Sequence, residues 1–177
     1  MFAFAFWEES GQKLYLARDR FGIKPLFLGM KNEHFYFASE IKDILPVLEN
    51  PSLDMKSIND YVNLGYTLSP NTPFREIKEI PPGHYAEISE TGYRLFPFDC
   101  ESSRPQNDFD SILQESLTSH LVSDVPVTML LSGGTDSTCL AIAGKNHKIS
   151  YSFLDMKNKA YSEAFKVEEL KDLLKIE

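Results

Sequence analysis

The chain has 177 residues, of which 42% are hydrophobic and 12% aromatic, a composition typical of one ordinary globular domain or two small ones. Its formal net charge of −8 argues against nucleic acid as a partner, and its apolar runs are too short to predict a membrane-spanning helix. The cysteines, Cys100 and Cys139, form neither a CxxC motif nor a disulfide framework, which favours a reducing, cytoplasmic location.

Residues 1–100 are predicted to form mainly β-structure. The chain opens with phenylalanines at 2, 4 and 6 that alternate with alanines, which is the period of a strand. Further strands are expected over 13–17, 25–30, 34–38, 85–88 and 93–98. The pattern predicts an antiparallel meander with aromatic side chains on its buried faces, and the opening Phe/Trp alternation is interpreted as core.

Two short helices are expected between these strands. Ser39 could cap a helix through 41–48, which Pro46 shortens or bends. Asp54 is the expected cap of a second helix, and Gly65 its end.

The charged string Arg18-Asp19-Arg20 could bind an anion. A salt-bridged structural turn at the domain interface is the more common role for such a string.

Polar residues 101–107 are the predicted linker, and the hydrophobic period changes to that of a helix from Asp108 onward, with Asp108 as its cap. The apolar run 125–131 predicts a strand buried on both faces. It is followed by an expected helix, strand and helix over 137–145, 148–154 and 161–174. This order is typical of the start of a parallel sheet, so the expected fold class is α+β followed by α/β. The mixed charges of 166–175 indicate a solvated helix face.

The string Ser132-Gly133-Gly134-Thr135-Asp136-Ser137 lies where the apolar strand ends and a helix begins. The two glycines permit positive φ and close approach of phosphate oxygens, while free amides, the helix dipole and serine hydroxyls supply positive partial charge. Asp136 would repel phosphate unless it caps the helix or holds Mg²⁺. A plain glycine turn with Asp136 as its cap is the alternative, but the full SGGxDS string favours a nucleotide loop.

This loop resembles the pyrophosphate-binding loop of the ATP-pyrophosphatase superfamily, and residues 119–127 before it resemble those of asparagine synthetases. Upstream blocks resemble, in family order, the second half of that family's class II glutamine amidotransferase domain. These blocks are 1–7, 17–26, 37–42, 64–66, 69–74 and 80–84. The resemblance implies a partial antiparallel Ntn-type glutaminase sheet over 1–100, the linker 101–107, and the start of a parallel-sheet ATP-pyrophosphatase domain over 108–177.

By this resemblance, ammonia from glutamine would attack a β-aspartyl-adenylate, giving asparagine, AMP and pyrophosphate. The implied cofactors are ATP and Mg²⁺, and the implied substrates of the intact enzyme are ATP, aspartate and glutamine. Leu131 and residues 132–137 would hold the ATP phosphates, with Asp136 near the metal, and Phe153 and Asp155 would meet the adenine or ribose. Thr135 and, more strongly, Asp155 depart from the aliphatic residues that the family has at these positions.

The family's N-terminal cysteine nucleophile has no counterpart, because residue 2 is Phe2, so no catalytic residue is assigned. The glutamine-binding segment would lie before Met1 and the aspartate pocket after Glu177. The chain is therefore expected to be a truncated form, inactive alone, with a homodimer or a complementing chain as its partner. The alternatives are a β-lactam synthetase, a lasso-peptide cyclase, a sugar-acid amidotransferase, or an inactive fragment that binds nucleotide or only associates.

Overall fold

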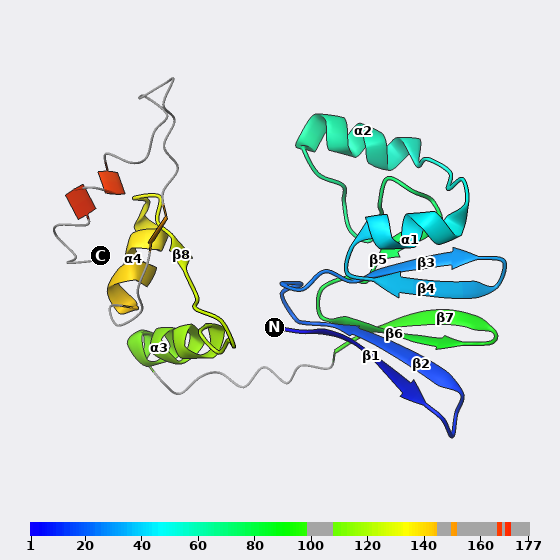
Figure 1. The fold of residues 1–177 in the computed structure, drawn as a ribbon, viewed down its shortest axis with the longest axis horizontal. Coiled ribbons are helices and arrows are strands. Elements are labelled where there is room, and N and C mark those ends of the chain that lie inside the picture. The colour runs from blue at the N-terminus through cyan, green and yellow to red at the C-terminus, as the bar shows by residue number, and fades with distance from the viewer. Residues whose placement is uncertain (99–107, 145–149, 152–165, 168, 171–177) are drawn as a thin grey trace. The chain divides into compact units, whose positions relative to one another are not determined.

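A computed structural model describes residues 1–98, 108–144, 150–151, 166–167 and 169–170 (Figure 1). The chain divides into two compact units, Met1–Glu101 and Ser102–Glu177, and each is described by itself. Within the described residues, no helix combines the length and the apolar character that a bilayer span requires.

Unit 1 contains two antiparallel sheets. The first has four strands in the order β1-β2-β6-β7, which are β1 (Ala3–Glu8), β2 (Lys13–Arg18), β6 (His84–Ser89) and β7 (Gly92–Pro97). The second has three strands in the order β4-β3-β5, which are β3 (Phe27–Lys31), β4 (His34–Ala38) and β5 (Ile77–Glu79). The predicted strands are confirmed to within a few residues, but the single meander is wrong. The chain leaves the first sheet after β2, builds the second, and returns.

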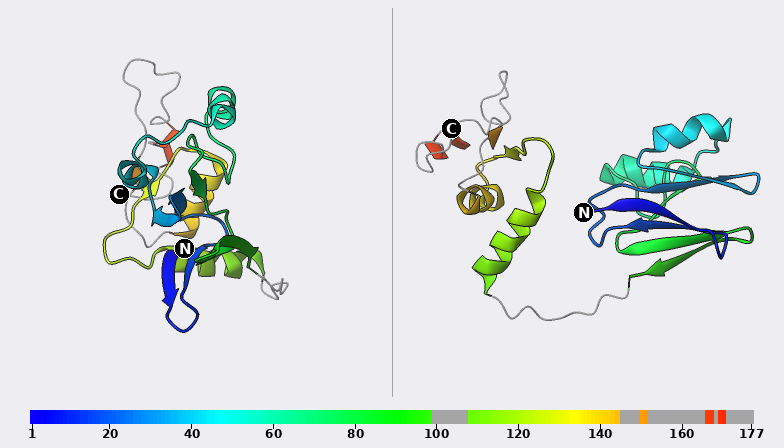
Figure 2. Two further views of the ribbon diagram at one scale, coloured as in Figure 1. Left: turned by 90° about the vertical axis from the view of Figure 1, so that its right-hand side faces the viewer. Right: turned by 60° about the horizontal axis from the view of Figure 1, so that its bottom comes forward.

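The reason for two sheets is burial. The two sheets form adjacent layers (Figure 2), and an apolar cluster contributed by both contains Leu16, Leu26, Leu28, Ile80, Ala86 and Ile88. A second cluster lies beneath α1 (Ile41–Leu48), where Ile44 and Leu48 meet Ile77 of β5. A single meander would have left these side chains exposed to water on one face. Their burial stabilises the fold by about 25 cal/mol for each Å² of apolar surface removed from water.

The opening aromatic strand is not core, contrary to the sequence-based interpretation. Phe2, Phe4, Phe6 and Trp7 are 40% to 58% exposed. Ala3, which alternates with the phenylalanines, is the residue that packs against the inter-sheet core. The phenylalanines continue an aromatic surface across the sheet, in which Phe6 lies 6.3 Å from the ring of Tyr15. The alternation correctly indicated two different faces, but of its residues only Ala3 packs against the core, and Ala5 is exposed.

The helices of unit 1 test the capping predictions. Asp54 caps α2 (Met55–Leu64) by accepting from the Lys56 amide, and Gly65 ends it at φ 81°, so both predictions are confirmed. The predicted Ser39 cap is wrong, because the N-cap of α1 is Glu40 and makes no side-chain capping bond. Pro46 lies inside α1, which has only 8 residues.

The turn after β2 is held from both sides by buried charges. Arg18 is 6% exposed and forms an ion pair with Glu79. Its guanidinium also donates to the carbonyl oxygens of Gly22, Lys24 and Ile80 at 2.8 to 2.9 Å. The expected salt bridge of this turn is therefore present, between Arg18 and Glu79, and the donors of Arg18 bind the protein itself rather than an anion. Its expected place at the domain interface stays a prediction.

Asp19 organises the other side of the same turn. Its Oδ1 accepts from the amides of Phe21 and Ile23, and its Oδ2 from those of Phe2 and Lys24, at 3.0 to 3.2 Å. Burial by itself would raise the pKa of this carboxyl group, but the four N–H donors outweigh it and lower the pKa to about 2. The carboxylate thus accepts hydrogen bonds from four backbone amides around this turn.

Unit 2 contains α3 (Phe109–His120), β8 (Met129–Leu130), α4 (Thr135–Ala143) and β9 (Ser150–Tyr151). Asp108 caps α3 by accepting from the Ser111 amide, as predicted. β8 and β9 pair in parallel, with Met129 opposite Ser150. The predicted strand 148–154 and helix 161–174 lie largely outside the described residues, although 166–167 and 169–170 are helical.

The strand expected over 125–131 is reduced to two residues and is not buried on both faces. Val125 is 68% exposed, Val127 37% and Leu130 70%, whereas Leu131 is buried. Only two strands pair in the described part of this unit, so nothing there covers both faces of β8. The helix predicted over 137–145 begins two residues earlier, at Thr135.

Candidate functional site

The candidate site is the loop between β8 and α4. Leu131 is 2% exposed and anchors the end of the strand. Gly133 follows at φ 73°, in the left-handed region that disfavours a side chain, and Gly134 returns to φ −77° as the N-cap of α4. The expectation that the glycines supply positive φ therefore holds for Gly133 alone.

The serine hydroxyls close the loop on itself. The Ser137 hydroxyl donates to the Gly134 carbonyl oxygen at 3.2 Å and lies 3.1 Å from the Ser132 hydroxyl. The Gly134 amide donates to the Ser132 hydroxyl at 3.3 Å, and the Ser132 amide to the Ser137 hydroxyl at 3.4 Å. These are long, weak bonds, so an anion that accepts more strongly can displace them at low cost.

The first turn of α4 presents amide groups next to these hydroxyls. Thr138 is the first residue whose amide bonds back, to the Gly134 carbonyl at 3.0 Å. The amides of Thr135, Asp136 and Ser137 have no hydrogen-bond partner among the described residues, as expected for the start of a helix. Three N–H groups therefore lie at the positive end of the helix dipole, and this arrangement suits an anion.

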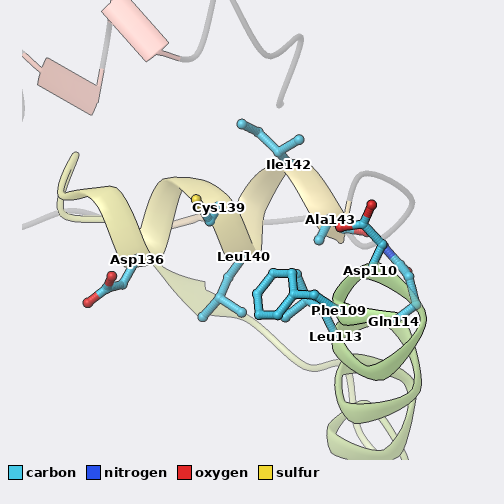
Figure 3. Close-up of a pocket in the computed structure, with 9 residues that line it drawn as sticks. All are labelled: Phe109, Asp110, Leu113, Gln114, Asp136, Cys139, Leu140, Ile142 and Ala143. Carbon is cyan, nitrogen blue, oxygen red and sulfur yellow. The ribbon is translucent and has the colours of Figure 1, made fainter. Parts of the chain in front are cut away.

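Asp136 lies in the first turn of α4 and is exposed. It does not cap the helix, because the N-cap is Gly134 and no side chain makes the capping bond, so the expected role of Asp136 as a helix cap is wrong. Figure 3 shows its carboxylate directed away from the apolar side chains of α4. No cluster of three metal-binding side chains occurs among the residues described. A single carboxylate suits Mg²⁺ only when phosphate and water supply the other ligands.

A hollow of about 700 Å³ lies beside this turn, between α3 and α4 (Figure 3). Its wall is apolar, with Phe109 and Leu113 from α3 and Leu140 and Ile142 from α4, and Asp136 contributes to its edge. The sequence placed the α3 residues on one helix face but could not show the cavity, because α4 completes it. An apolar wall does not suit phosphate.

The cysteines and the predicted nucleoside contacts add no further group to this loop within the described residues. Cys139 is exposed on α4, while Cys100 lies outside the described residues. Phe153 and Asp155, the predicted contacts for adenine or ribose, also lie outside the described part of the chain.

One neighbour of the loop was missed by sequence reasoning, which assigned it to a solvated helix face. A Cβ atom added at Gly133 would lie 2.8 Å from Cβ of Lys166 and 3.5 Å from its Cδ. Leu170, one helical turn later, would lie 3.8 Å away. No sequence pattern connects residues that are 33 positions apart, so only the tertiary structure reveals this contact.

Comparisons with known proteins agree along the chain. Residues 1–99 match the family model of a glutamine amidotransferase domain, and residues 108–177 that of asparagine synthase. Asparagine synthetase [glutamine-hydrolyzing] 3 of Bacillus subtilis (strain 168) is 37% identical over 157 residues, which cover 83% of this chain and 26% of the relative. Asparagine synthetase B [glutamine-hydrolyzing] of Escherichia coli (strain K12) is 32% identical over 157 residues, which cover 83% of this chain and 24% of that protein.

Another relative carries a different name. Amidase chry2 of Gibberella zeae is 30% identical over 153 residues, which cover 79% of this chain and 22% of that protein. The chain therefore spans about a quarter of the length of the curated relatives it matches.

Proposed function

The chain belongs to the glutamine-hydrolysing asparagine synthetase family, and from this premise we propose that it serves in the ATP-dependent amidation of aspartate, with glutamine as the source of ammonia. In this proposal residues 1–100 belong to the glutaminase domain and 101–107 are the linker. Residues 108–177 begin the parallel-sheet ATP-pyrophosphatase domain.

The observation that carries the proposal is the β8–α4 loop. Three amides without a partner in the described part of the chain, the left-handed Gly133 and two serine hydroxyls lie at the carboxyl end of a strand that pairs in parallel. Open α/β sheets bind ligands at this end of their strands. The donors are closely spaced N–H and O–H groups at the start of a helix, and such groups suit the oxygens of an anion such as phosphate.

Each residue has a role in this proposal. ATP, when bound, supplies the adenylyl group that activates the acceptor carboxylate. The amides of 135–137 bind phosphate oxygens, and the Ser132 and Ser137 hydroxyls exchange their mutual hydrogen bonds for bonds to phosphate. Asp136 holds Mg²⁺ against the phosphates, which removes the repulsion that its charge would otherwise cause. Leu131 keeps the loop anchored to the strand, and Phe153 and Asp155 are proposed to meet the nucleoside.

Isothermal titration with ATP and with pyrophosphate, each with and without Mg²⁺, tests the loop. We expect Asp136→Asn to weaken Mg²⁺-dependent binding more than Mg²⁺-free binding. Asp124→Asn is the matched control, because Asp124 is exposed and precedes the loop. The absence of binding by the unmodified chain would contradict the nucleotide-loop proposal, and equal losses with and without Mg²⁺ would remove Asp136 from the metal site.

A second candidate keeps the ATP chemistry but uses another acceptor, as in a β-lactam synthetase, a lasso-peptide cyclase or a sugar-acid amidotransferase. The similarity to amidase chry2 is the observation in its favour. A homodimer or a complementing chain, and a cytoplasmic location, stay predictions from the sequence.

A further inference from the structure

The phosphate loop has no positive side chain of its own. Residues 121–144 contain no lysine, arginine or histidine, and they include two acidic residues, Asp124 and Asp136. Amides and hydroxyls alone would thus have to hold a multiply charged anion beside a carboxylate. Phosphate sites usually add a cation to such donors, because charge-assisted hydrogen bonds are about twice as strong as neutral ones.

Lys166 is placed where it could supply that cation. Both its Cβ and its Cδ lie close to the position of a Cβ on Gly133, at 2.8 and 3.5 Å. The stem of the side chain therefore runs over the loop, and only Cε and the ammonium group extend further. Lys166 is exposed, and it is the only lysine or arginine among the described residues of unit 2.

We propose that Lys166 is a phosphate-binding residue, whose ammonium group donates to the anion that the β8–α4 loop holds. The inference rests on the proposed function, because it assumes that this loop binds the phosphates of ATP. It adds a specific reason for glycine at 133. A side chain there would adopt an unfavourable φ and would also displace the Lys166 stem from the loop.

Packing alone is the competing explanation, since lysine stems often cover apolar or backbone surface while the charged group stays in water. The two explanations differ in what they require. Packing needs the methylenes only, whereas phosphate binding needs the charge. Substitutions that keep the stem but change the charge therefore separate them.

The test is calorimetric titration of the full chain with inorganic pyrophosphate and with ATP in Mg²⁺. Lys166→Met keeps the length of the stem and removes the charge, and Lys166→Arg keeps the charge. We expect Lys166→Met to weaken pyrophosphate binding about tenfold, the usual loss for one hydrogen bond to a charged group. We expect Lys166→Arg to retain most of the affinity and added salt to reduce the difference between them.

Lys56→Met is the control for a change of net charge, because Lys56 is an exposed residue of α2 in unit 1. Far-UV circular dichroism of each variant checks that the fold is retained. An affinity of Lys166→Met equal to that of the unmodified chain overturns the inference and leaves the loop proposal standing. Equal losses in Lys166→Met and Lys166→Arg would show that the loss does not follow the charge, and they also overturn it. An unmodified chain that binds neither ligand overturns the proposed function, and the inference with it.

Discussion

The two units differ in how their shape is held. Unit 1 buries leucine and isoleucine side chains between two sheets and beneath α1. In unit 2, Leu131 and Ala141 are the only residues described as buried, while Phe109, Val122, Val125 and Leu130 are 68% to 82% exposed. Residues far apart in sequence therefore hold unit 1. The loop of unit 2 is held mainly by hydrogen bonds between residues at most five positions apart.

This difference shows that a functional loop can be organised locally while its surroundings remain open. The strand-to-helix turn needs one left-handed glycine and two hydroxyls, which the sequence itself supplies. A sheet core needs partners on both faces. We therefore expect changes in unit 1 to act on unfolding and changes in unit 2 to act on anion binding.

The largest effect is expected from Asp19→Asn. Either orientation of the asparagine amide turns an NH₂ group toward two backbone donors, where the carboxylate now accepts from four. The free energy of unfolding should fall by about 3 kcal/mol, the usual cost of breaking a buried polar network. Urea unfolding followed by the fluorescence of Trp7, the single tryptophan, measures unit 1 alone.

Glu90→Gln in the exposed β6–β7 turn is the control for this substitution, and it should leave the transition unchanged. Pyrophosphate affinity should be the same in Asp19→Asn as in the unmodified chain under conditions where both are folded. A parallel loss of stability and affinity would show that the two units depend on each other.

The next effect is expected at Gly133. Gly133→Val forces a β-branched residue into positive φ and against the stem of Lys166. Pyrophosphate affinity should fall by about 2 kcal/mol, or roughly thirtyfold, with no shift in the Trp7 transition. Gly134→Ala is the matched control, because φ there is −77° and the nearest atom to the added Cβ is the Ser132 hydroxyl oxygen at 3.3 Å. If the alanine at 134 were the more damaging change, the assignment of the left-handed position would be wrong.

Lowering the pH should reduce the free energy of unfolding of unit 1, because Asp19 becomes protonated. Its pKa in the folded state, about 2, lies below the ordinary value of 3.8. The carboxylate's contribution to stability is therefore complete above about pH 4 and is lost as the pH falls toward 2. The loss should be smaller than that in Asp19→Asn, because a protonated carboxyl group keeps one carbonyl oxygen. Urea midpoints between pH 5 and pH 2.5 measure it, and Asp19→Asn should show a flatter dependence than the unmodified chain.

The smallest effect is expected from the helix caps, one in each unit. Asp54→Ala removes the cap of α2 and should lower the unfolding free energy of unit 1 by about 1 kcal/mol. Asp108→Ala removes the corresponding cap of α3 and should reduce the helical signal in circular dichroism without moving the Trp7 transition. Equal shifts of that transition in both variants would mean that the two units unfold together and not independently.

Local features of the protein could be predicted from its sequence. The caps Asp54 and Asp108, the helix end at Gly65 and the strands of unit 1 other than β5 were expected, because each depends on residues within one or two turns or on a period of two. The three-residue strand β5 is too short to show such a period. The position of the glycine loop between a strand and a helix followed from the same kind of local pattern. The motif and its flanks also indicated the family, because the order of short blocks survives when most residues differ.

The tertiary structure decided what depends on distant partners. Alternation of phenylalanine and alanine in β1 defines two faces, but only the second sheet determines that Ala3 rather than the aromatic rings meets the core. The left-handed conformation belongs to Gly133 and not to Gly134, because the start of α4 requires extended backbone at its N-cap. Lys166 reaches the loop through a fold that brings together residues 33 positions apart. Local sequence carries no information on such contacts, since the energy that selects them comes from packing the whole unit.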